Sequence, residues 1–292
     1  MGKVYDALRR AESQRSERRA PPAGFPATVD PTGPHSALRP HEREAAAPAR
    51  EKPGRLARLQ QLLRRDRSGA GADDAGAINK RRITLLQPDS FVAEQFRTLR
   101  ARLDSLAAER PMRTIAITSA LPGEGKTTAS INLALVSAMA VGRRVLLVDC
   151  DLRRPKVHTA LGLRPEVGLA EVLTDQATAE RAICKVEGSS LEVLPVRGTP
   201  SNPAELLASA RMRALLEELA RTYDLVILDT PPTLALPDAK VLSELVDGVV
   251  LVVRADETPE DDVQAAMDLL DRRRLLGVVL NGAETDTQRY GY

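Results

Sequence analysis

From Arg81 onward, short apolar runs alternate with longer stretches in which apolar residues recur every three or four positions. The short runs are continuous, as in strands that are buried on both faces of a parallel sheet. The longer stretches have the period of amphipathic helices. The predicted strands are Thr114–Ser119, Val145–Asp149, Leu191–Pro195, Leu225–Asp229, Gly248–Val253 and Gly277–Leu280. The predicted helices are Ser90–Ala108, Lys126–Ala140, Pro203–Arg221, Asp238–Val246 and Glu260–Arg273.

These elements predict an α/β fold with a doubly wound, mostly parallel sheet flanked by helices. Ligands of such folds bind beyond the carboxyl ends of the strands. We therefore expect the functional residues immediately after the predicted strands, within a domain that covers residues 81–282.

Residues 1–80 differ in composition from the rest of the chain. They hold 16 Lys+Arg against 10 Asp+Glu, and 8 of the 20 prolines. Such a segment buries too little apolar surface to offset its chain entropy, so we predict a largely disordered basic tail. Two stretches, Lys3–Arg19 and Arg55–Arg67, gather apolar residues on one helical face. They are predicted to be short amphipathic helices, which either contact anionic lipid or a partner helix, or remain nascent helices in a solvated linker.

Composition argues against several classes of protein. The 292 residues include no apolar run near the roughly 20 residues of a spanning helix, and the first residues lack the apolar centre of a signal peptide. We therefore expect a cytoplasmic protein. The only cysteines, Cys150 and Cys184, lack CxxC spacing, which argues against a disulfide scaffold or a zinc site. The basic residues lack interleaved aromatic residues, so we expect no nucleic-acid binding.

A glycine-rich loop follows the first predicted strand. Its sequence, Ala120-Leu-Pro-Gly-Glu-Gly-Lys-Thr-Thr128, is the P-loop pattern with alanine at the position of the first glycine. The glycines let backbone N–H groups converge on phosphate oxygens, and the following helix adds its positive N-terminal end. The lysine reaches the β- and γ-phosphates, and the hydroxyl after it binds Mg²⁺. The residues predicted to bind nucleotide in this loop are Gly123, Glu124, Gly125, Lys126, Thr127 and Thr128.

Carboxylates follow two other predicted strands. Asp149 ends the second strand and Asp151 follows two residues later, and Asp229 ends the fourth strand. Beside a P-loop, such carboxylates hold Mg²⁺ directly or through water, or accept a proton from an attacking hydroxyl. The alternative is that each of them caps a turn or a helix.

Together these motifs resemble those of the bacterial tyrosine kinases, P-loop kinases of the deviant Walker type that act in polysaccharide synthesis and export. The resemblance spans about residues 81–282. It rests on the segments SALPGEGKTT, LLVDCDLRRPKVHTALGL and VILDTPP, on Glu94-x-x-Arg97-x-x-Arg100 and on Asn202-Pro-Ala-Glu-Leu-Leu207. The last motif also reads as a helix start, with Asn202 in a capping box. The opening MGKVYDALRRAE and the ending RYGY resemble cytoplasmic members tied to exosortase-type polysaccharide loci.

The resemblance implies ATP and Mg²⁺ as cofactors and assigns roles to the residues at the strand ends. It implies that Asn281 contacts the adenine, although a turn-forming asparagine is an open alternative. For Arg153, stabilisation of transferred charge and an ordinary ion pair both remain open. The implied catalytic residues are Lys126, Asp149 and Asp151, and the implied metal ligands are Thr127, Asp149 and Asp229.

The resemblance also implies partners. Glu94, Arg97 and Arg100 would join subunits into a homo-oligomeric ring, whereas without the family they describe an ordinary helix surface with an internal ion pair. A separate membrane-bound polysaccharide co-polymerase is implied as activator, which would place the chain at the inner face of the cell membrane.

Residues 283–292 are predicted to form a flexible tail that carries the phosphate acceptors. Tyr290 and Tyr292 are two of only four tyrosines in the chain, and core packing gives no reason to place them at a terminus. The family carries a C-terminal tyrosine cluster that is autophosphorylated, which implies phosphorylation of these residues between subunits. Phosphorylation would add negative charge, loosen the ring and gate polymer export.

Two other functions fit parts of the sequence. One is a non-kinase P-loop switch ATPase of the partition or cell-division type, but Ser119–Leu121 lacks the extra lysine usual there. The other is a nucleotide-binding scaffold of an export complex. Turnover of ATP would separate the scaffold from both enzymes.

Overall fold

The computed structural model describes residues 82–283, which lie within one compact unit, Leu59–Tyr292. The predicted basic tail with its two amphipathic stretches and the predicted tyrosine tail lie outside the described residues. Among the helices that are described, none is long and apolar enough to cross a membrane.

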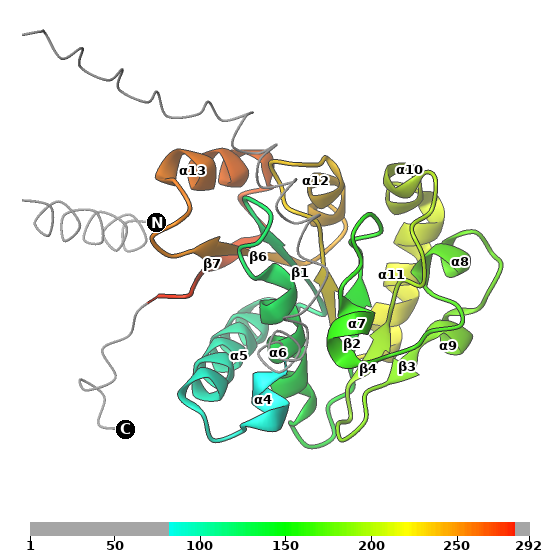
Figure 1. Cartoon of the computed structure of the whole chain (residues 1–292), viewed down its shortest axis with the longest axis horizontal. Coiled ribbons are helices and arrows are strands. Elements are labelled where there is room, and N and C mark those ends of the chain that lie inside the picture. Colours follow the sequence, from blue (N-terminus) through cyan, green and yellow to red (C-terminus); the bar gives the residue numbers. More distant parts are fainter. Residues whose placement is uncertain (1–81, 284–292) are drawn as a thin grey trace, which may run out of the picture. The chain divides into compact units, whose positions relative to one another are not determined.

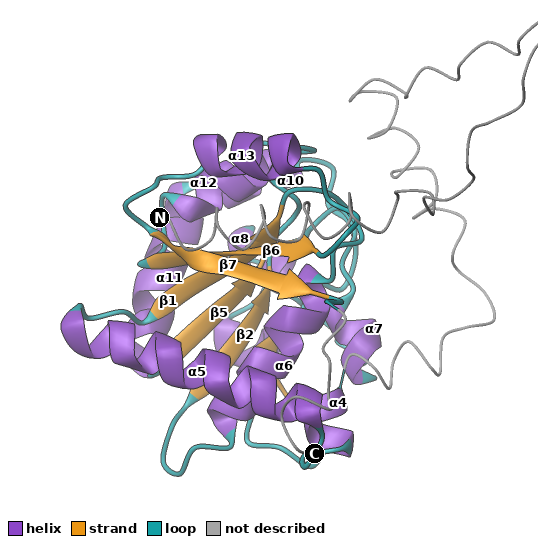
Figure 2. Ribbon diagram, turned by 90° about the vertical axis from the view of Figure 1, so that its left-hand side faces the viewer, coloured by secondary structure: helices purple, strands orange, loops and turns teal. Residues whose placement is uncertain are grey.

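The described residues form a seven-stranded sheet with the order β3-β4-β2-β5-β1-β6-β7 (Figures 1 and 2). All neighbouring strands pair in parallel except β3 and β4, which pair antiparallel. The predicted α/β fold class is therefore confirmed. The strands are β1 Thr114–Ser119, β2 Val145–Asp149, β3 Cys184–Lys185, β4 Glu192–Leu194, β5 Leu225–Asp229, β6 Gly248–Arg254 and β7 Leu275–Asn281.

Helices cover both faces of this sheet (Figure 2). They are α4 Ile83–Leu86, α5 Phe91–Glu109, α6 Lys126–Ala138, α7 Val157–Leu161, α8 Leu169–Leu173, α9 Ala179–Ala182, α10 Pro203–Leu207, α11 Ala210–Thr222, α12 Asp238–Ser243 and α13 Glu260–Leu269. The five predicted helices all appear, but two of them end early: Asp238–Val246 ends at Ser243 and Glu260–Arg273 ends at Leu269. The predicted helix Pro203–Arg221 is two helices, because the Ser209 side chain accepts a hydrogen bond from the Met212 N–H and starts α11 anew.

The start of α10 corrects a second expectation. Pro203 occupies the first turn as predicted, but the Asn202 side chain makes no capping hydrogen bond to the helix backbone. Instead its amide donates to the Glu205 carboxylate at 3.1 Å. The predicted capping box is therefore absent at this helix.

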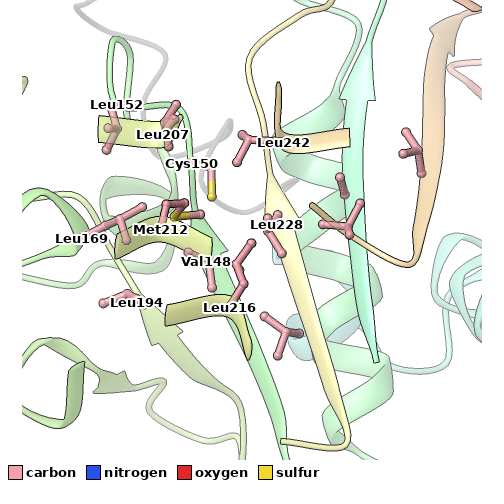
Figure 3. Close-up of a cluster of buried hydrophobic side chains, with 14 of the residues drawn as sticks. Val148, Cys150, Leu152, Leu169, Leu194, Leu207, Met212, Leu216, Leu228 and Leu242 are labelled. Atoms are coloured by element: carbon pink, nitrogen blue, oxygen red, sulfur yellow. The ribbon is translucent and has the colours of Figure 1, made fainter. Parts of the chain in front are cut away.

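Two apolar cores sit on opposite faces of the sheet because successive strand residues point to opposite sides. In β2, Leu146 and Val148 belong to one core, whereas Val145 and Leu147 belong to the other. The first core packs under α8 to α13, and part of it is drawn in Figure 3. The second packs under α5, α6 and α7. Burial on both faces explains why β1, β2, β5 and β6 are continuous apolar runs in the sequence. The edge strand β7 is also an apolar run, but it is only partly buried.

Candidate active site

The carboxyl ends of three adjacent strands bring the predicted chemistry to one edge of the sheet. β5 lies between β2 and β1, and Asp149 is the register partner of Asp229. The glycine-rich loop leaves β1 beside them and leads into α6 (Figure 1). The structure therefore brings the P-loop together with both acidic motifs.

The glycine-rich loop turns through two left-handed backbone positions. Gly123 has φ +88° and Gly125 has φ +94°, a region that residues with a side chain adopt only at a cost. Gly125 immediately precedes α6, so the loop presents the free N–H groups of the helix start to the site. This is the geometry that binds phosphate at helix N-termini.

The Glu124 side chain turns inward and braces the loop. It is 3% exposed, and its carboxylate accepts hydrogen bonds from the Leu121 N–H at 2.6 Å and from the Thr258 hydroxyl. Burial raises the pKa of Glu124, and these hydrogen bonds oppose the rise. The side chain is thus held inside the domain, and nucleotide binding by Glu124 stays a prediction that rests on its backbone N–H.

Asn281, the last residue of β7, also contacts this loop. Its amide donates to the Glu124 carbonyl at 2.8 Å. An added Cβ on Gly125 would lie 2.0 Å from the Asn281 Nδ2 atom, so the asparagine fills the space beside that glycine. The structure thus shows a bracing contact for Asn281, and its contact with adenine stays a prediction.

Lys126 is held among carboxylates. Its Nζ atom lies 3.0 Å from Asp151 Oδ2, and the two side chains are 12% and 7% exposed. Burial by itself would lower the pKa of Lys126, but the charges of Asp229 and Asp151 outweigh it and raise the pKa. The lysine therefore carries its positive charge throughout the physiological pH range.

Asp229 is fully buried and anchored from α6. Its two oxygens accept from the Thr127 hydroxyl at 2.7 Å and from the Ser130 hydroxyl at 3.0 Å. Burial raises the pKa of Asp229, while Lys126 pulls it back. The sequence did not single out Ser130 as a site residue, although Ser130 lies one helical turn beyond Thr127 on the same face of α6.

Asp149 is anchored by the backbone that follows it. Its oxygens accept from the N–H groups of Asp151 at 3.2 Å and Val157 at 3.1 Å. Burial raises the pKa of Asp149 well above its ordinary value, and the neighbouring Asp229 and Asp151 add to the rise. A carboxylate in such surroundings takes up a proton more readily than an exposed one.

Arg153 is paired across the site rather than free. Its Nε and Nη2 atoms lie 2.8 and 3.4 Å from the Asp238 carboxylate, at the start of α12. Asp238 is 1% exposed and the arginine side chain 35%. The ion pair that was one of the two possibilities for Arg153 is thus observed, and stabilisation of transferred charge by Arg153 stays a prediction. Asp238 was missed because nothing in the sequence links it to position 153.

The three residues predicted to join subunits make contacts within the chain. The Arg97 guanidinium binds Glu94 and donates to the Pro88 carbonyl, the latter at 2.7 Å. Arg100 donates to the Val136 carbonyl near the end of α6, also at 2.7 Å. Their role in assembly stays a prediction, as do the acceptor roles of Tyr290 and Tyr292 outside the described residues.

The donor set at the strand ends fits Mg²⁺. The Thr127 hydroxyl, Asp229 and Asp149 offer oxygen ligands, which this ion prefers. Among residues 82–283, no group of three or more His, Cys, Asp or Glu could hold a metal ion by itself. That suits an ion that is usually held by one or two carboxylates together with waters and substrate phosphates.

The loop, the lysine and the buried carboxylates define a P-loop nucleotide-binding protein. A family profile described as AAA domain matches residues 112–270. The chain belongs to the bacterial tyrosine-protein kinases, as its resemblance to that family predicted. It is 42% identical over 213 residues to the tyrosine-protein kinase YwqD of Bacillus subtilis (strain 168), covering 72% of this chain and 90% of that protein.

Other relatives agree. The succinoglycan biosynthesis transport protein ExoP of Rhizobium meliloti (strain 1021) is 35% identical over 215 residues, covering 72% of this chain and 27% of that protein. The kinase domain of the Escherichia coli tyrosine kinase ETK aligns with a TM-score of 0.65 at 35% identity, covering 70% of this chain and 82% of that one. A chimerical protein, CapA2B2, aligns with a TM-score of 0.66 at 35% identity, covering 70% and 91%.

Proposed function

We propose that this tyrosine kinase transfers the γ-phosphoryl group of ATP to Tyr290 and Tyr292 of a neighbouring copy, and so regulates the synthesis and export of a polysaccharide. The observation that carries the kinase chemistry is the cluster of Lys126 with Asp149, Asp151 and Asp229 at the P-loop. Support for the polysaccharide comes from the relative that is named for succinoglycan biosynthesis.

The chain's own residues supply binding and orientation. The loop N–H groups and the N-terminal end of α6 attract the phosphates, and Lys126 contacts the β- and γ-phosphates. Mg²⁺ would be held by Thr127 and Asp229 together with Asp149. When bound, the ion would neutralise charge on the transferred phosphoryl group. The cation of Lys126 must turn from Asp151 towards the phosphates, because one ammonium group now faces that carboxylate at 3.0 Å.

In this mechanism a carboxylate at the site accepts the proton of the acceptor tyrosine. Free tyrosine has a pKa of about 10, so a base is needed near neutral pH. Both oxygens of Asp149 accept backbone hydrogen bonds, and Asp149 is fully buried. In Asp151 only the Oδ1 atom accepts a backbone hydrogen bond, from Arg154, so the Oδ2 atom would lose its partner when Lys126 turns to the phosphates. We therefore assign proton acceptance to Asp151 and its positioning to the Asp149 anchor.

The assembly is part of the same proposal. A tail that starts after Gly282 reaches about 33 Å at most over ten residues, enough to enter a neighbour's site in a ring. We propose that Glu94, Arg97 and Arg100 of α5 contact the neighbouring subunit. We also propose that a separate membrane-bound co-polymerase activates the kinase. The partner would hold the chain at the inner face of the cell membrane.

Phosphosite mass spectrometry on the full chain tests the reaction. The protein is incubated with Mg-ATP beside a Lys126→Met variant, and cleavage after Glu284 releases one short peptide with both tail tyrosines. We expect phosphate on Tyr290 or Tyr292 in the wild type alone. ATP hydrolysis without tyrosine phosphate would instead support a switch ATPase. If neither is seen even with the cytoplasmic segment of the co-polymerase added, a nucleotide-binding scaffold is the better description.

A further inference from the structure

A groove lies at the end of α6 that is remote from the P-loop. It has a volume of about 690 Å³ and is formed by α4, the end of α6, the loop into β2 and the turn before β4. α6 has 13 residues and is therefore about 20 Å long. The groove is thus separated from the nucleotide site by the length of one helix.

The groove is apolar and its edge is exposed. Leu85, Leu135 and Val145 line it. At its edge Met139 is half-exposed and Val141 is fully exposed, although both are large apolar residues. Single exposed apolar residues are common, but two beside an apolar groove are typical of an interaction site.

The charged groups at the groove are engaged within the domain. Arg143 donates to Asp104 at 2.8 Å. Arg144 lies over the ring of Tyr223 at 4.8 Å, and the Tyr223 hydroxyl donates to Glu192 at 2.6 Å. The surface left for a ligand is therefore mainly apolar, which favours an apolar helix face over a charged peptide.

The chain itself enters the domain at this groove. Thr84 and Leu85, among the first described residues, line it, and the Thr84 N–H and hydroxyl both donate to Asn132 in α6, at 3.1 and 3.0 Å. Upstream, the sequence 59–67 places Leu59, Leu62 and Leu63 on one helical face. A flexible linker as long as the Gly- and Ala-containing stretch 68–81 would span on average about 20 Å, and would give a local concentration in the millimolar range.

We propose that residues 59–67 of the same chain dock this leucine face into the groove as a short helix, with their arginines directed to solvent. This contact would place the end of the basic segment against the end of α6 that is remote from Lys126. The proposal does not depend on the phosphorylation reaction.

Hydrogen exchange of the full-length protein, followed by mass spectrometry, tests it. A helix of this length is marginal in water by itself, so slow exchange in residues 59–67 requires docking. Val141→Lys puts a positive charge at the groove edge, which opposes burial of the leucine face and repels the arginines of residues 59–67. Because the Val141 side chain is fully exposed, the fold is unaffected. We expect exchange in residues 59–67 to accelerate at least about tenfold in this variant.

Leu269→Lys is the matched control, because Leu269 is also exposed, at 43%, but lies on α13. It should leave the exchange of residues 59–67 unchanged. The proposal is overturned if these residues exchange at the random-coil rate in the wild type, or if Val141→Lys does not accelerate them. It is equally overturned if their protection depends on protein concentration, since a second copy would then fill the groove.

Discussion

The two glycines of the phosphate-binding loop share a left-handed backbone but differ in their surroundings. A Cβ added to Gly123 meets nothing within 4 Å, whereas one added to Gly125 lies 2.0 Å from Asn281 Nδ2. Gly123→Ala therefore measures backbone strain alone. Gly125→Ala measures the same strain plus displacement of the asparagine.

The expected magnitudes follow from these two effects. A left-handed alanine costs about 1–2 kcal/mol, of which about 0.4–1 kcal/mol is offset by the smaller entropy of the unfolded chain. Gly123→Ala should thus lower the free energy of unfolding by about 1 kcal/mol. In Gly125→Ala the displaced Asn281 also loses its 2.8 Å hydrogen bond to the Glu124 carbonyl, which adds about 1 kcal/mol.

Urea denaturation of the nucleotide-free protein measures these values, and a double-mutant cycle with Asn281→Ala isolates the contact. Once the asparagine is gone, Gly125→Ala should cost only what Gly123→Ala costs, which corresponds to a coupling of about 1 kcal/mol. A Gly125→Ala penalty that is equal with and without Asn281 would refute the reasoning, because the strain would then be in the backbone alone.

Two further predictions concern paired side chains. In urea denaturation, Arg153→Ala should lower the free energy of unfolding more than Asp238→Asn does. The first variant leaves the buried Asp238 carboxylate without its cation, whereas the asparagine amide of the second needs no cation. Equal losses of unfolding free energy in the two variants would contradict this prediction. Burial, reinforced by Glu192, raises the pKa of Tyr223 to about 12. Between pH 10 and 12 the unfolded chain therefore loses this proton first, and the free energy of unfolding should fall as the pH rises. Tyr223→Phe should remove this part of the pH dependence of the unfolding free energy. If the difference in unfolding free energy between wild type and Tyr223→Phe stays constant from pH 10 to 12, the pKa of Tyr223 is not raised.

The sequence predicted the centre of the sheet well because the central strands are buried on both faces. Continuous apolar runs are typical of strands that helices cover on both sides, and Val145–Asp149 and Leu225–Asp229 were placed with their observed bounds. Their parallel pairing then puts Asp149 and Asp229 in register, so two motifs 80 residues apart meet at the P-loop. The predicted meeting of loop and carboxylates followed from topology rather than from local propensity.

What the sequence did not predict depends on contacts between distant segments. The position of Glu124 in the loop gave no sign that its side chain would be buried. The buried carboxylate accepts a hydrogen bond from the hydroxyl of Thr258, which lies 134 residues further along the chain. Ser130 and Asp238 likewise acquire their partners only in the folded chain. The short strand β3 has two residues, too few for any periodic pattern to mark.

The carboxylate cluster is better explained by function than by stability. Asp149 and Asp229 are fully buried, and burial raises the pKa of both, which means that the fold works against their ionised forms. A single ammonium group, that of Lys126, offsets three carboxylates, so replacement by apolar residues would be expected to stabilise the domain. The same excess of negative charge holds Lys126 protonated and turned inward until an anion competes for it. In the proposed mechanism, phosphate binding would separate Lys126 from Asp151, and would thereby link occupation of the nucleotide site to exposure of the proposed base.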